Sequence, residues 1–194
     1  MQEEKVIQGQ LEQTIELMHC LQKEAKTLVK IASVITNALE KGKKVLVFGN
    51  GGSAADAQHI ACELSGKFYL KRQPLPAIAL TTNTSVLTSI GNDYSYEEIF
   101  SHQVKGLAAK GDVVIGLSTS GESENVIQGI EEASRLGAIT IAFTGKKGKL
   151  KNLAKYALSI PSTDTPRVQE AHITAAHIIC FLVEQKMFGK GRHA

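Results

Sequence analysis

The sequence predicts an α/β fold in which a five-stranded parallel sheet is flanked by helices, a flavodoxin-like three-layer sandwich. Two observations support this fold class. Short apolar runs recur along the chain, and segments with helical periodicity lie between most of them. The runs are continuously apolar rather than alternating, which is typical of parallel strands that are buried on both faces. The expected strands are residues 44–48, 77–80, 112–117, 139–143 and 157–160.

Length and composition favour a single globular domain that spans residues 1–194. The chain has 194 residues, of which 43% are hydrophobic, and this is enough for a full core. The formal net charge is +3, and the one dense basic run, residues 146–151, is interrupted by glycine and leucine. Binding to a phosphate backbone normally needs a clustered basic face. We therefore expect a solvated turn at this run and no nucleic-acid partner.

Cysteine usage and hydropathy favour a cytoplasmic protein. Cys20, Cys62 and Cys180 are an odd number of cysteines, lie far apart and form no CxxC pair. They therefore indicate neither a disulfide framework nor a thiolate metal site. The N-terminus shows no apolar leader, and no run reaches the roughly 18 apolar residues of a membrane span. We expect no membrane partner.

Two helices are expected before the first strand. Between residues 6 and 25, apolar side chains recur every three or four positions, which predicts an amphipathic helix with one narrow apolar stripe. Residues 28–39 repeat this spacing and stop before Gly42, a typical left-handed helix cap. We expect residues 1–42 to form an N-terminal helical arm that packs between subunits, and residues 43–194 to form the α/β core.

The chemistry is expected where the first strand passes through a glycine turn, residues 49–53, into a helix. This order places backbone N–H groups at a helix N-terminus, which favours an anion or a polar ligand. The helix carries His59 and Glu63, which are four residues apart and share one helical face, within reach of one metal ion or substrate. A lone histidine is more often a hydrogen-bonded, partly buried residue, but Glu63 on the same face favours a site.

Small hydroxyl side chains follow the third strand. Residues 117–123 read Leu-Ser-Thr-Ser-Gly-Glu-Ser and open a helix, so they offer hydroxyl and N–H groups around one concavity. The loop lacks a P-loop lysine and a GxGxxG pattern, which favours a sugar phosphate over a nucleoside triphosphate or NAD. Taken alone, the pattern also fits an ordinary capped Ser/Thr turn. Its position beyond a strand's carboxyl end, shared with residues 49–53, favours a ligand site.

Two further segments carry polar side chains. Residues 91–93, Gly-Asn-Asp, end a helix and are consistent with sugar binding or with a plain turn. The final helix, residues 167–187, is apolar on nearly all sides, so we expect it to be buried in the core or in an oligomer interface. Buried polar groups need partners, which indicates a site or a hydrogen-bond network in this helix. Its polar members are Gln169, Glu170, His172 and His177.

These segments together resemble the sugar isomerase (SIS) domain family and, within it, the sedoheptulose 7-phosphate isomerases. The resemblance covers essentially the whole chain and implies an SIS-type fold. Its most specific parts are the Gly-Asn-Gly-Gly-Ser turn and the Asp-Ala-Gln-His-Ile-Ala-Cys-Glu-Leu stretch after it. The matching residues are 49–53, 56–64, 91–93, 99–100, 111–114, 118–121, 167–172 and His177.

The resemblance implies a homotetramer with active sites between subunits, a sugar phosphate as substrate and one zinc ion per subunit. The implied zinc ligands are His59, Glu63, Gln169 and His177. The implied phosphate contacts are Ser118, Thr119, Ser120 and Ser123. The other implied substrate contacts are Asn50, Gly51, Gly52, Ser53, Glu63, Asn92, Asp93 and Gln169.

The implied reaction converts sedoheptulose 7-phosphate to D-glycero-D-manno-heptose 7-phosphate, the first step toward activated heptose for lipopolysaccharide or surface glycans. A ketose becomes an aldose when a proton moves from C1 to C2 through an enediol. This transfer needs a base, an acid and stabilisation of the oxyanion. We assign Glu63 as the catalytic base and His177 as the partnering acid–base group, with the metal polarising the carbonyl.

Two non-catalytic classes with the same fold are alternatives. One is a tetramer that binds a replication initiator protein, and the other senses a sugar phosphate without turnover. The first lacks the acid–base pair, whereas this chain has Glu63, His177, Gly52 and Gly121. The second usually sits beside a DNA-binding module, which this sequence lacks. These features favour the enzyme.

One segment departs from the family pattern. Residues 162–166 do not follow the usual loop of the isomerases, and Pro166 stands where an acidic residue is expected. This departure bears on contacts to the far end of the sugar rather than on the type of reaction.

Overall fold

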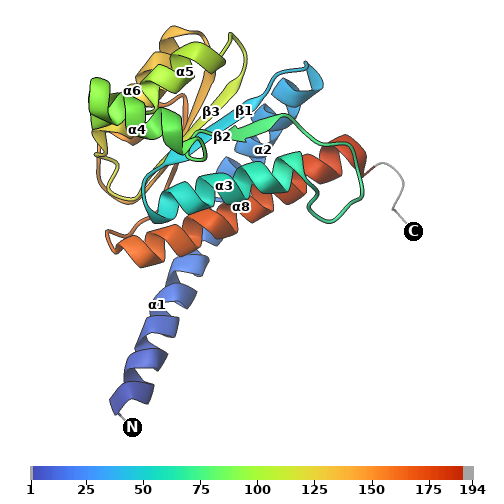
Figure 1. Ribbon diagram of the computed structural model, residues 1–194. Helices are drawn as coiled ribbons and strands as arrows, with labels where there is room; N and C mark the ends of the chain where they lie inside the picture. The colour runs from blue at the N-terminus through green and yellow to red at the C-terminus, as the bar shows by residue number, and fades with distance from the viewer. Residues whose placement is uncertain (1, 190–194) are drawn as a thin grey trace.

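The computed structural model describes residues 2–189 and confirms the predicted fold class (Figure 1). Five parallel strands form one sheet in the order β2-β1-β3-β4-β5. The predicted and observed bounds of every strand differ by at most one residue. The strands are β1 Val45–Gly49, β2 Ala77–Ala79, β3 Val113–Ser118, β4 Ile139–Thr144 and β5 Tyr156–Ser159.

The apolar strands contribute side chains to two separate cores, one on each face of the sheet. In β1, Val45 and Val47 belong to one core, whereas Leu46 and Phe48 belong to the other. Successive side chains of a strand point to opposite faces, so a strand covered on both sides must be apolar at every position. The sandwich therefore has three layers, as predicted.

Helices divide between the two faces of the sheet (Figure 1). The first core packs against α1 Gln2–Lys23, α2 Ala25–Glu40, α3 Gly52–Ser65 and α8 Thr165–Phe188. The second core packs against α4 Thr84–Asp93, α5 Ser101–Leu107, α6 Glu124–Arg135 and α7 Leu150–Leu153, and the 3-10 turn η1 Tyr96–Glu98 lies between α4 and α5. No helix in the described part of the chain is long and apolar enough to cross a bilayer.

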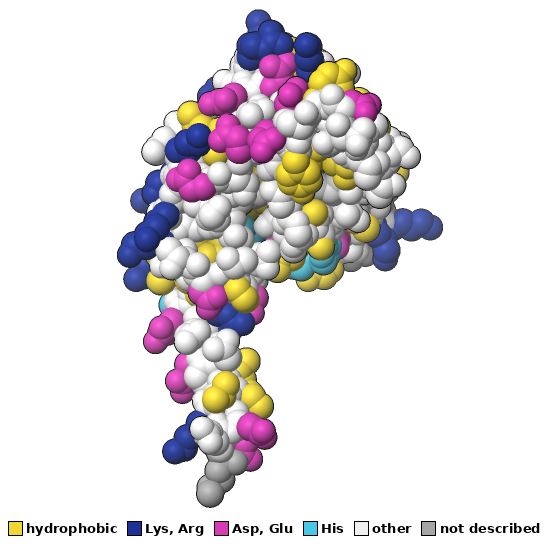
Figure 2. Space-filling view, turned by 60° about the vertical axis from the view of Figure 1, so that its left-hand side comes forward, with side chains coloured by type: hydrophobic (Ala, Val, Ile, Leu, Met, Phe, Trp, Pro, Cys, Tyr) yellow, Lys and Arg dark blue, Asp and Glu magenta, His cyan; other side chains and the backbone are white. Residues whose placement is uncertain are grey.

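The N-terminal arm projects from the body along α1, and hydrophobic side chains gather along it (Figure 2). Only Leu17 and Leu21 are buried in this helix. The apolar stripe of its first half is 57–61% exposed and comprises Val6, Ile7, Leu11 and Ile15. In contrast, α2 packs against α8, and Gly42 after it has the expected positive φ of 69°. The projecting part of the arm is therefore α1.

Helices α3 and α8 lie side by side and position the candidate site (Figure 1). Helix α3 begins just after the carboxyl end of β1, and α8 begins after β5. Their N-termini therefore meet at the carboxyl edge of the sheet, where open parallel sheets bind ligands. Pro166 lies in the first turn of α8, where a missing backbone N–H costs no intrahelical hydrogen bond.

Candidate active site

A cavity of about 270 Å³ lies at the carboxyl ends of β1 and β3. It brings together the glycine turn, the hydroxyl loop and the start of α8, which are far apart in the sequence. Most of the predicted substrate-binding residues therefore share one concavity. Its lining residues are Asn50, Gly51, Gly52, Ser53, Leu117, Ser118, Thr119, Ser123, Thr165 and Gln169.

The glycine turn lets α8 approach the start of α3 closely. A Cβ on Gly52 would lie 2.4 Å from Nε2 of Gln169, well inside van der Waals contact. No side chain fits at this position unless the Gln169 amide moves. Gly52 therefore places the Gln169 amide against the N-terminus of α3.

Ser118 organises the hydroxyl loop. Its Oγ accepts a hydrogen bond from the Gly121 backbone N–H at 3.1 Å. The same Oγ lies 2.9 Å from Oγ of Ser123 and 3.3 Å from Oγ of Ser120. Gly121 has a positive φ of 70°, and a Cβ there would lie 2.6 Å from the Lys147 carbonyl oxygen. The loop is thus folded around its own hydroxyls at the N-terminal end of α6, where an anion is favoured.

Asn50 is held by two residues that the sequence analysis did not single out. Its side-chain amide exchanges two hydrogen bonds, of 2.8 and 3.0 Å, with the amide of buried Asn125. The Tyr96 hydroxyl also donates to Oδ1 of Asn50, at 3.4 Å. The signal for Asn125 was a polar side chain beside buried Val126 and Ile127 in a helix, because such a group needs a partner.

Asn92 and Asp93 end α4 and are exposed. The Asn92 amide donates to Oδ1 of Asp93 at 2.8 Å, and neither residue lines the cavity. The nearest link from this region to the cavity is Tyr96, which contacts Asn50. Sugar binding by Asn92 and Asp93 therefore stays a prediction.

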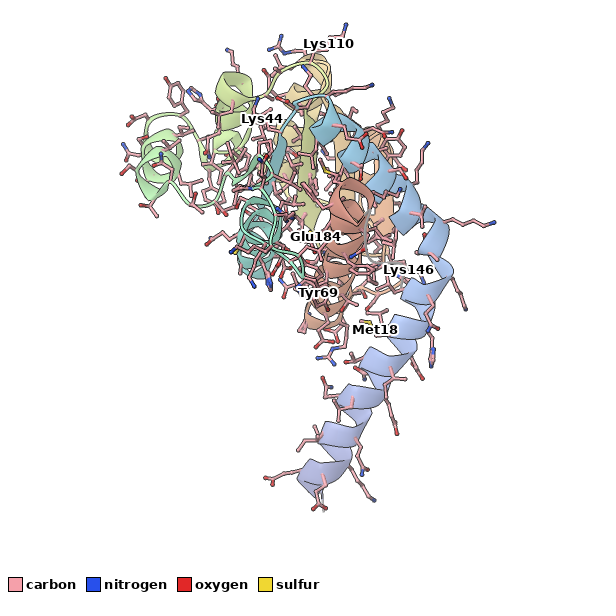
Figure 3. All side chains as sticks on the ribbon, turned by 90° about the vertical axis from the view of Figure 1, so that its right-hand side faces the viewer. Met18, Lys44, Tyr69, Lys110, Lys146 and Glu184 are labelled. Carbon is pink, nitrogen blue, oxygen red and sulfur yellow. The ribbon has the colours of Figure 1, made fainter. Side chains whose placement is uncertain are left out.

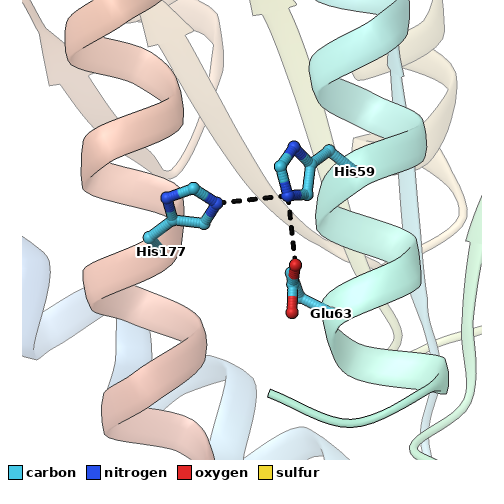
Figure 4. Close-up of side chains that lie close together, drawn as sticks. All are labelled: His59, Glu63 and His177. Atoms are coloured by element: carbon cyan, nitrogen blue, oxygen red, sulfur yellow. Dashed lines mark hydrogen bonds and ion pairs between the residues drawn. The ribbon is translucent and has the colours of Figure 1, made fainter. Parts of the chain in front are cut away.

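His59, Glu63 and His177 form a compact cluster between α3 and α8 (Figure 4). Nε2 of His59 lies 3.0 Å from Oε1 of Glu63 and 3.2 Å from Nε2 of His177. The side chain of His59 is 45% exposed and that of Glu63 is 19% exposed, so the cluster is open to a ligand. His59 and Glu63 share one helical face, as their spacing predicted, and α8 supplies the third member.

This donor set fits a metal ion such as zinc. Imidazole nitrogens and a carboxylate oxygen are preferred zinc ligands, and tetrahedral ligands about 2.0–2.1 Å from zinc lie roughly 3.3 Å apart. The two separations from Nε2 of His59, 3.0 and 3.2 Å, are close to that value, and all three ligand atoms lie within 4.8 Å of one another. Gln169 lies eight residues before His177 on α8 and lines the cavity, so its place among the zinc ligands stays a prediction.

The other polar residues of α8 belong to internal networks. Glu170 pairs with Arg167 at 2.6 Å and accepts a hydrogen bond from the Thr14 hydroxyl at 2.9 Å, which joins α8 to α1. His172 is fully buried, and its Nε2 lies 3.2 Å from the Thr144 carbonyl oxygen. Burial lowers the pKa of His172 to about 4, although this hydrogen bond acts in the opposite direction. His172 is therefore neutral near pH 7.

Asp56 is a further titratable group on α3 that the sequence analysis left without a role. Partial burial raises its pKa to about 6, and the nearby charge of His59 acts in the opposite direction. Its Oδ2 is buried and has no hydrogen-bond partner among the described residues. Asp56 therefore adds a carboxyl group with a pKa of about 6 beside the cluster.

Known proteins match this chain over most of its length. The SIS domain pattern matches residues 11–145. The phosphoheptose isomerase of Aquifex aeolicus (strain VF5) is 58% identical over 162 residues, 83% of this chain and 85% of that protein. That of Clostridium acetobutylicum is 52% identical over 188 residues, 95% of this chain and 96% of that protein. The solved structure of a phosphoheptose isomerase from Francisella tularensis has a TM-score of 0.92 at 35% identity, and the match covers 95% of this chain and 100% of that chain.

Proposed function

This chain belongs to the SIS domain family, among the phosphoheptose isomerases, and we propose that it isomerises sedoheptulose 7-phosphate with a bound divalent metal ion, zinc in the first instance. The product is D-glycero-D-manno-heptose 7-phosphate. One observation carries the proposal: three metal-ligating side chains converge beside a cavity that is lined by small hydroxyls. A non-catalytic role is not favoured, because Glu63 and His177 lie in that same cluster.

The cavity and the cluster are spaced to hold the two ends of one substrate. Gly52 lines the cavity and His59 belongs to the cluster, seven residues further along α3, which is about 10 Å at 1.5 Å per residue. An extended seven-carbon sugar phosphate has a comparable length between its phosphorus and C1. We place the phosphate against Ser118, Thr119, Ser120 and Ser123, and the C1–C2 end at the cluster.

Glu63 and His177 carry the proton transfers. Oε1 of Glu63 faces His59, and within the described residues Oε2 forms no hydrogen bond, so Oε2 is free to accept the proton of C1. The same carboxyl then returns this proton to C2, while His177 moves a proton between the hydroxyl on C1 and the oxygen on C2. A bound metal ion supplies polarisation of the carbonyl and stabilises the charge on oxygen. With Oε1 as the metal ligand and Oε2 as the base, the Glu63 carboxylate serves in both roles.

Gln169 completes the proposed ligand set. The zinc ligands would be His59, Glu63, His177 and the amide oxygen of Gln169. In the structure this amide packs against Gly52 at the start of α3, so ligation requires the Gln169 side chain to turn along α8 toward His177. Its position also supports a contact to the sugar chain, together with Asn50, Gly51, Gly52, Ser53, Asn92 and Asp93.

We also place the protein in the cytoplasm, as a homotetramer with active sites between subunits. All three cysteines are free, which suits a reducing compartment. An apolar cavity of about 380 Å³ lies between α1, α2 and α8, and the exposed stripe of α1 lies beyond it. Leu11→Asp combined with Ile15→Asp should lower the mass measured by light scattering, because charges would then occupy an apolar interface. Glu12→Lys is the control, since it leaves the stripe unchanged, and a tetrameric double variant would contradict the proposal.

The activity is tested with purified, zinc-loaded protein and sedoheptulose 7-phosphate. The expected result is a new aldose phosphate whose C2 proton comes partly from solvent, detected by NMR in D₂O. Fructose 6-phosphate serves as the comparison substrate, because its shorter chain spans the distance between the cavity and the cluster less well. Absence of turnover in metal-replete buffer would contradict the proposed function. The place of the product in activated heptose synthesis for lipopolysaccharide or surface glycans is part of the same proposal.

A further inference from the structure

A buried carboxylate near the end of α8 holds the loop that follows α3. Glu184 has no exposed surface, and its carboxylate accepts hydrogen bonds from three successive backbone N–H groups. These groups belong to Phe68, Tyr69 and Leu70, at 3.1, 2.8 and 3.0 Å. Figure 3 shows Glu184 close to the loop that carries Tyr69. One side chain of α8 therefore fixes three consecutive residues of a loop.

Arg72 extends this contact to the end of α3. Its Nε donates to Oε1 of Glu184 at 2.9 Å. Its Nη2 donates to the backbone carbonyl of Glu63 at 2.8 Å, and its Nη1 to that of Leu64 at 2.9 Å. The last carbonyls of a helix have no intrahelical partner, and a cation is favoured beside them. The planar guanidinium of Arg72 thus links the backbone carbonyl of Glu63 on α3 to the carboxylate of Glu184 on α8 through hydrogen bonds.

The two charges of this pair are nearly inaccessible to solvent. The side chain of Arg72 is 2% exposed and that of Glu184 is 0% exposed. Burial alone would raise the pKa of Glu184, but the three backbone N–H groups and Arg72 lower it below its usual value. The carboxylate therefore stays ionised, and the pair has fixed geometry because each charged atom already has its partners.

The pair borders the metal cluster directly. Glu63 is both a member of the cluster and the residue whose carbonyl Arg72 holds. The ring of Phe68, in the loop fixed by Glu184, lies 5.9 Å from the ring of His177. Cys180 lies on α8 between His177 and Glu184. Burial raises the pKa of its thiol to about 12; the charges of Glu63 and Glu184 act in the same direction, and that of Arg72 acts in the opposite direction. Both carboxylates therefore lie close to one buried thiol.

We propose that Arg72 and Glu184 are positioning residues that set the spacing between Glu63 and His177, and thereby the affinity of the cluster for metal. The inference rests on the proposed metal-dependent function. Neither residue lines the cavity in which we place the phosphate. Their effect passes through the end of α3 and through the loop that packs on His177. Groups that orient metal ligands typically change metal affinity by about 10- to 100-fold when they are altered.

The test compares variants of this pair with a matched control pair. Arg72→Lys keeps the charge but loses the planar fork, and Glu184→Gln keeps the shape but loses the charge. The control is Lys44→Met, which removes the charged partner of Asp112, a 2% exposed carboxylate whose contact with Lys44 Nζ is 2.6 Å. Lys44 and Asp112 precede β1 and β3, at the opposite edge of the sheet from the site. The control therefore disrupts a buried carboxylate far from the cluster.

For each protein the zinc dissociation constant is measured by competition with a chromophoric chelator, together with kcat, KM and the melting temperature of the metal-free form. We expect zinc affinity in Arg72→Lys and Glu184→Gln to fall by about tenfold or more, and kcat at limiting zinc to fall with it. KM should change by less than about threefold, because the phosphate loop is untouched. Lys44→Met should lower the melting temperature and leave zinc affinity unchanged.

The outcomes separate this inference from the proposed function. If wild-type protein neither binds zinc nor turns over the sugar phosphate, the proposed function fails. If wild-type protein does both, and the two variants keep its zinc affinity while they melt at a lower temperature like Lys44→Met, the pair is merely structural and the inference is overturned. If one of Arg72→Lys and Glu184→Gln cannot be purified in folded form, the other is used, because the zinc affinity of either variant alone tests the inference.

Discussion

The cavity and the metal cluster differ in how complete each is within the folded chain. In the cavity, the Ser118 hydroxyl and the Asn50 amide already have hydrogen-bond partners. In the cluster, Nε2 of His59 faces a carboxylate oxygen and a second imidazole nitrogen, and all three atoms carry lone pairs. A proton on one nitrogen satisfies only part of this arrangement, whereas a shared cation satisfies all of it. The cavity is preorganised, whereas the proposed metal ion would complete the cluster.

The largest expected effect comes from the cluster. Glu63→Gln and His177→Gln should each lower kcat by about a thousandfold, because each removes a group to which we assign a proton transfer. Circular dichroism and light scattering should show an unchanged fold and assembly. His19→Gln changes an exposed histidine of α1 and is the control. Near-normal activity in either variant would contradict the acid–base assignment.

A smaller effect is expected from His172, which lies on α8 between Gln169 of the cavity and His177 of the cluster. Its pKa of about 4 in the folded protein is below the ordinary value of 6.5, so the unfolded chain takes up this proton first as the pH falls. The stability contributed by neutral His172 is therefore complete above pH 6.5 and is lost as the pH falls toward 4. The loss should be about 3 kcal/mol in the free energy of unfolding.

This expectation is checked by urea unfolding from pH 8 to pH 4.5. The free energy of unfolding of wild-type protein should fall more steeply with acid than that of His172→Gln, which cannot titrate at this position. A variant whose acid dependence matches the wild type would contradict the assignment of a neutral, buried His172. The comparison of the two slopes removes the contribution of Asp56, which both proteins share.

The smallest expected effect comes from the hydroxyl loop. Gly121→Ala places a Cβ 2.6 Å from the Lys147 carbonyl oxygen at a φ of 70°, so the loop must shift. We expect KM for the sugar phosphate to rise by about tenfold and kcat to change little, since ground-state and transition-state binding of the phosphate weaken together. Gly106→Ala in α5, where the added Cβ meets no atom within 4 Å, is the control. An unchanged KM would show that the loop does not hold the phosphate.

The fold followed from the sequence because each strand carries its own signal. Val45 to Phe48 are apolar at every position, and a run of this kind requires cover on both faces. The sequence also predicted that His59 and Glu63 of the cluster lie together, because they are four residues apart on a helix. Their partner on α8, His177, was assigned from family resemblance, since its meeting with His59 depends on how two helices pack.

The sequence pattern did not predict the contacts between distant segments. The amide pair of Asn50 and Asn125 joins positions 75 residues apart, and the ion pair of Arg72 and Glu184 joins positions 112 residues apart. Nothing in the local spacing of these residues indicates a partner. The structure buries Asn125 and Glu184, and a buried polar group needs a partner.

The most direct test of the account separates binding from turnover in one preparation. Zinc-loaded and chelator-treated protein are compared for turnover of sedoheptulose 7-phosphate and for its dissociation constant by calorimetry. Removal of the metal should lower turnover by at least about a hundredfold, whereas the dissociation constant should rise by less than about tenfold, since the preorganised cavity remains. Readdition of zinc should restore turnover. Full turnover by the metal-free protein would contradict the assignment of His59, Glu63 and His177 as a metal site.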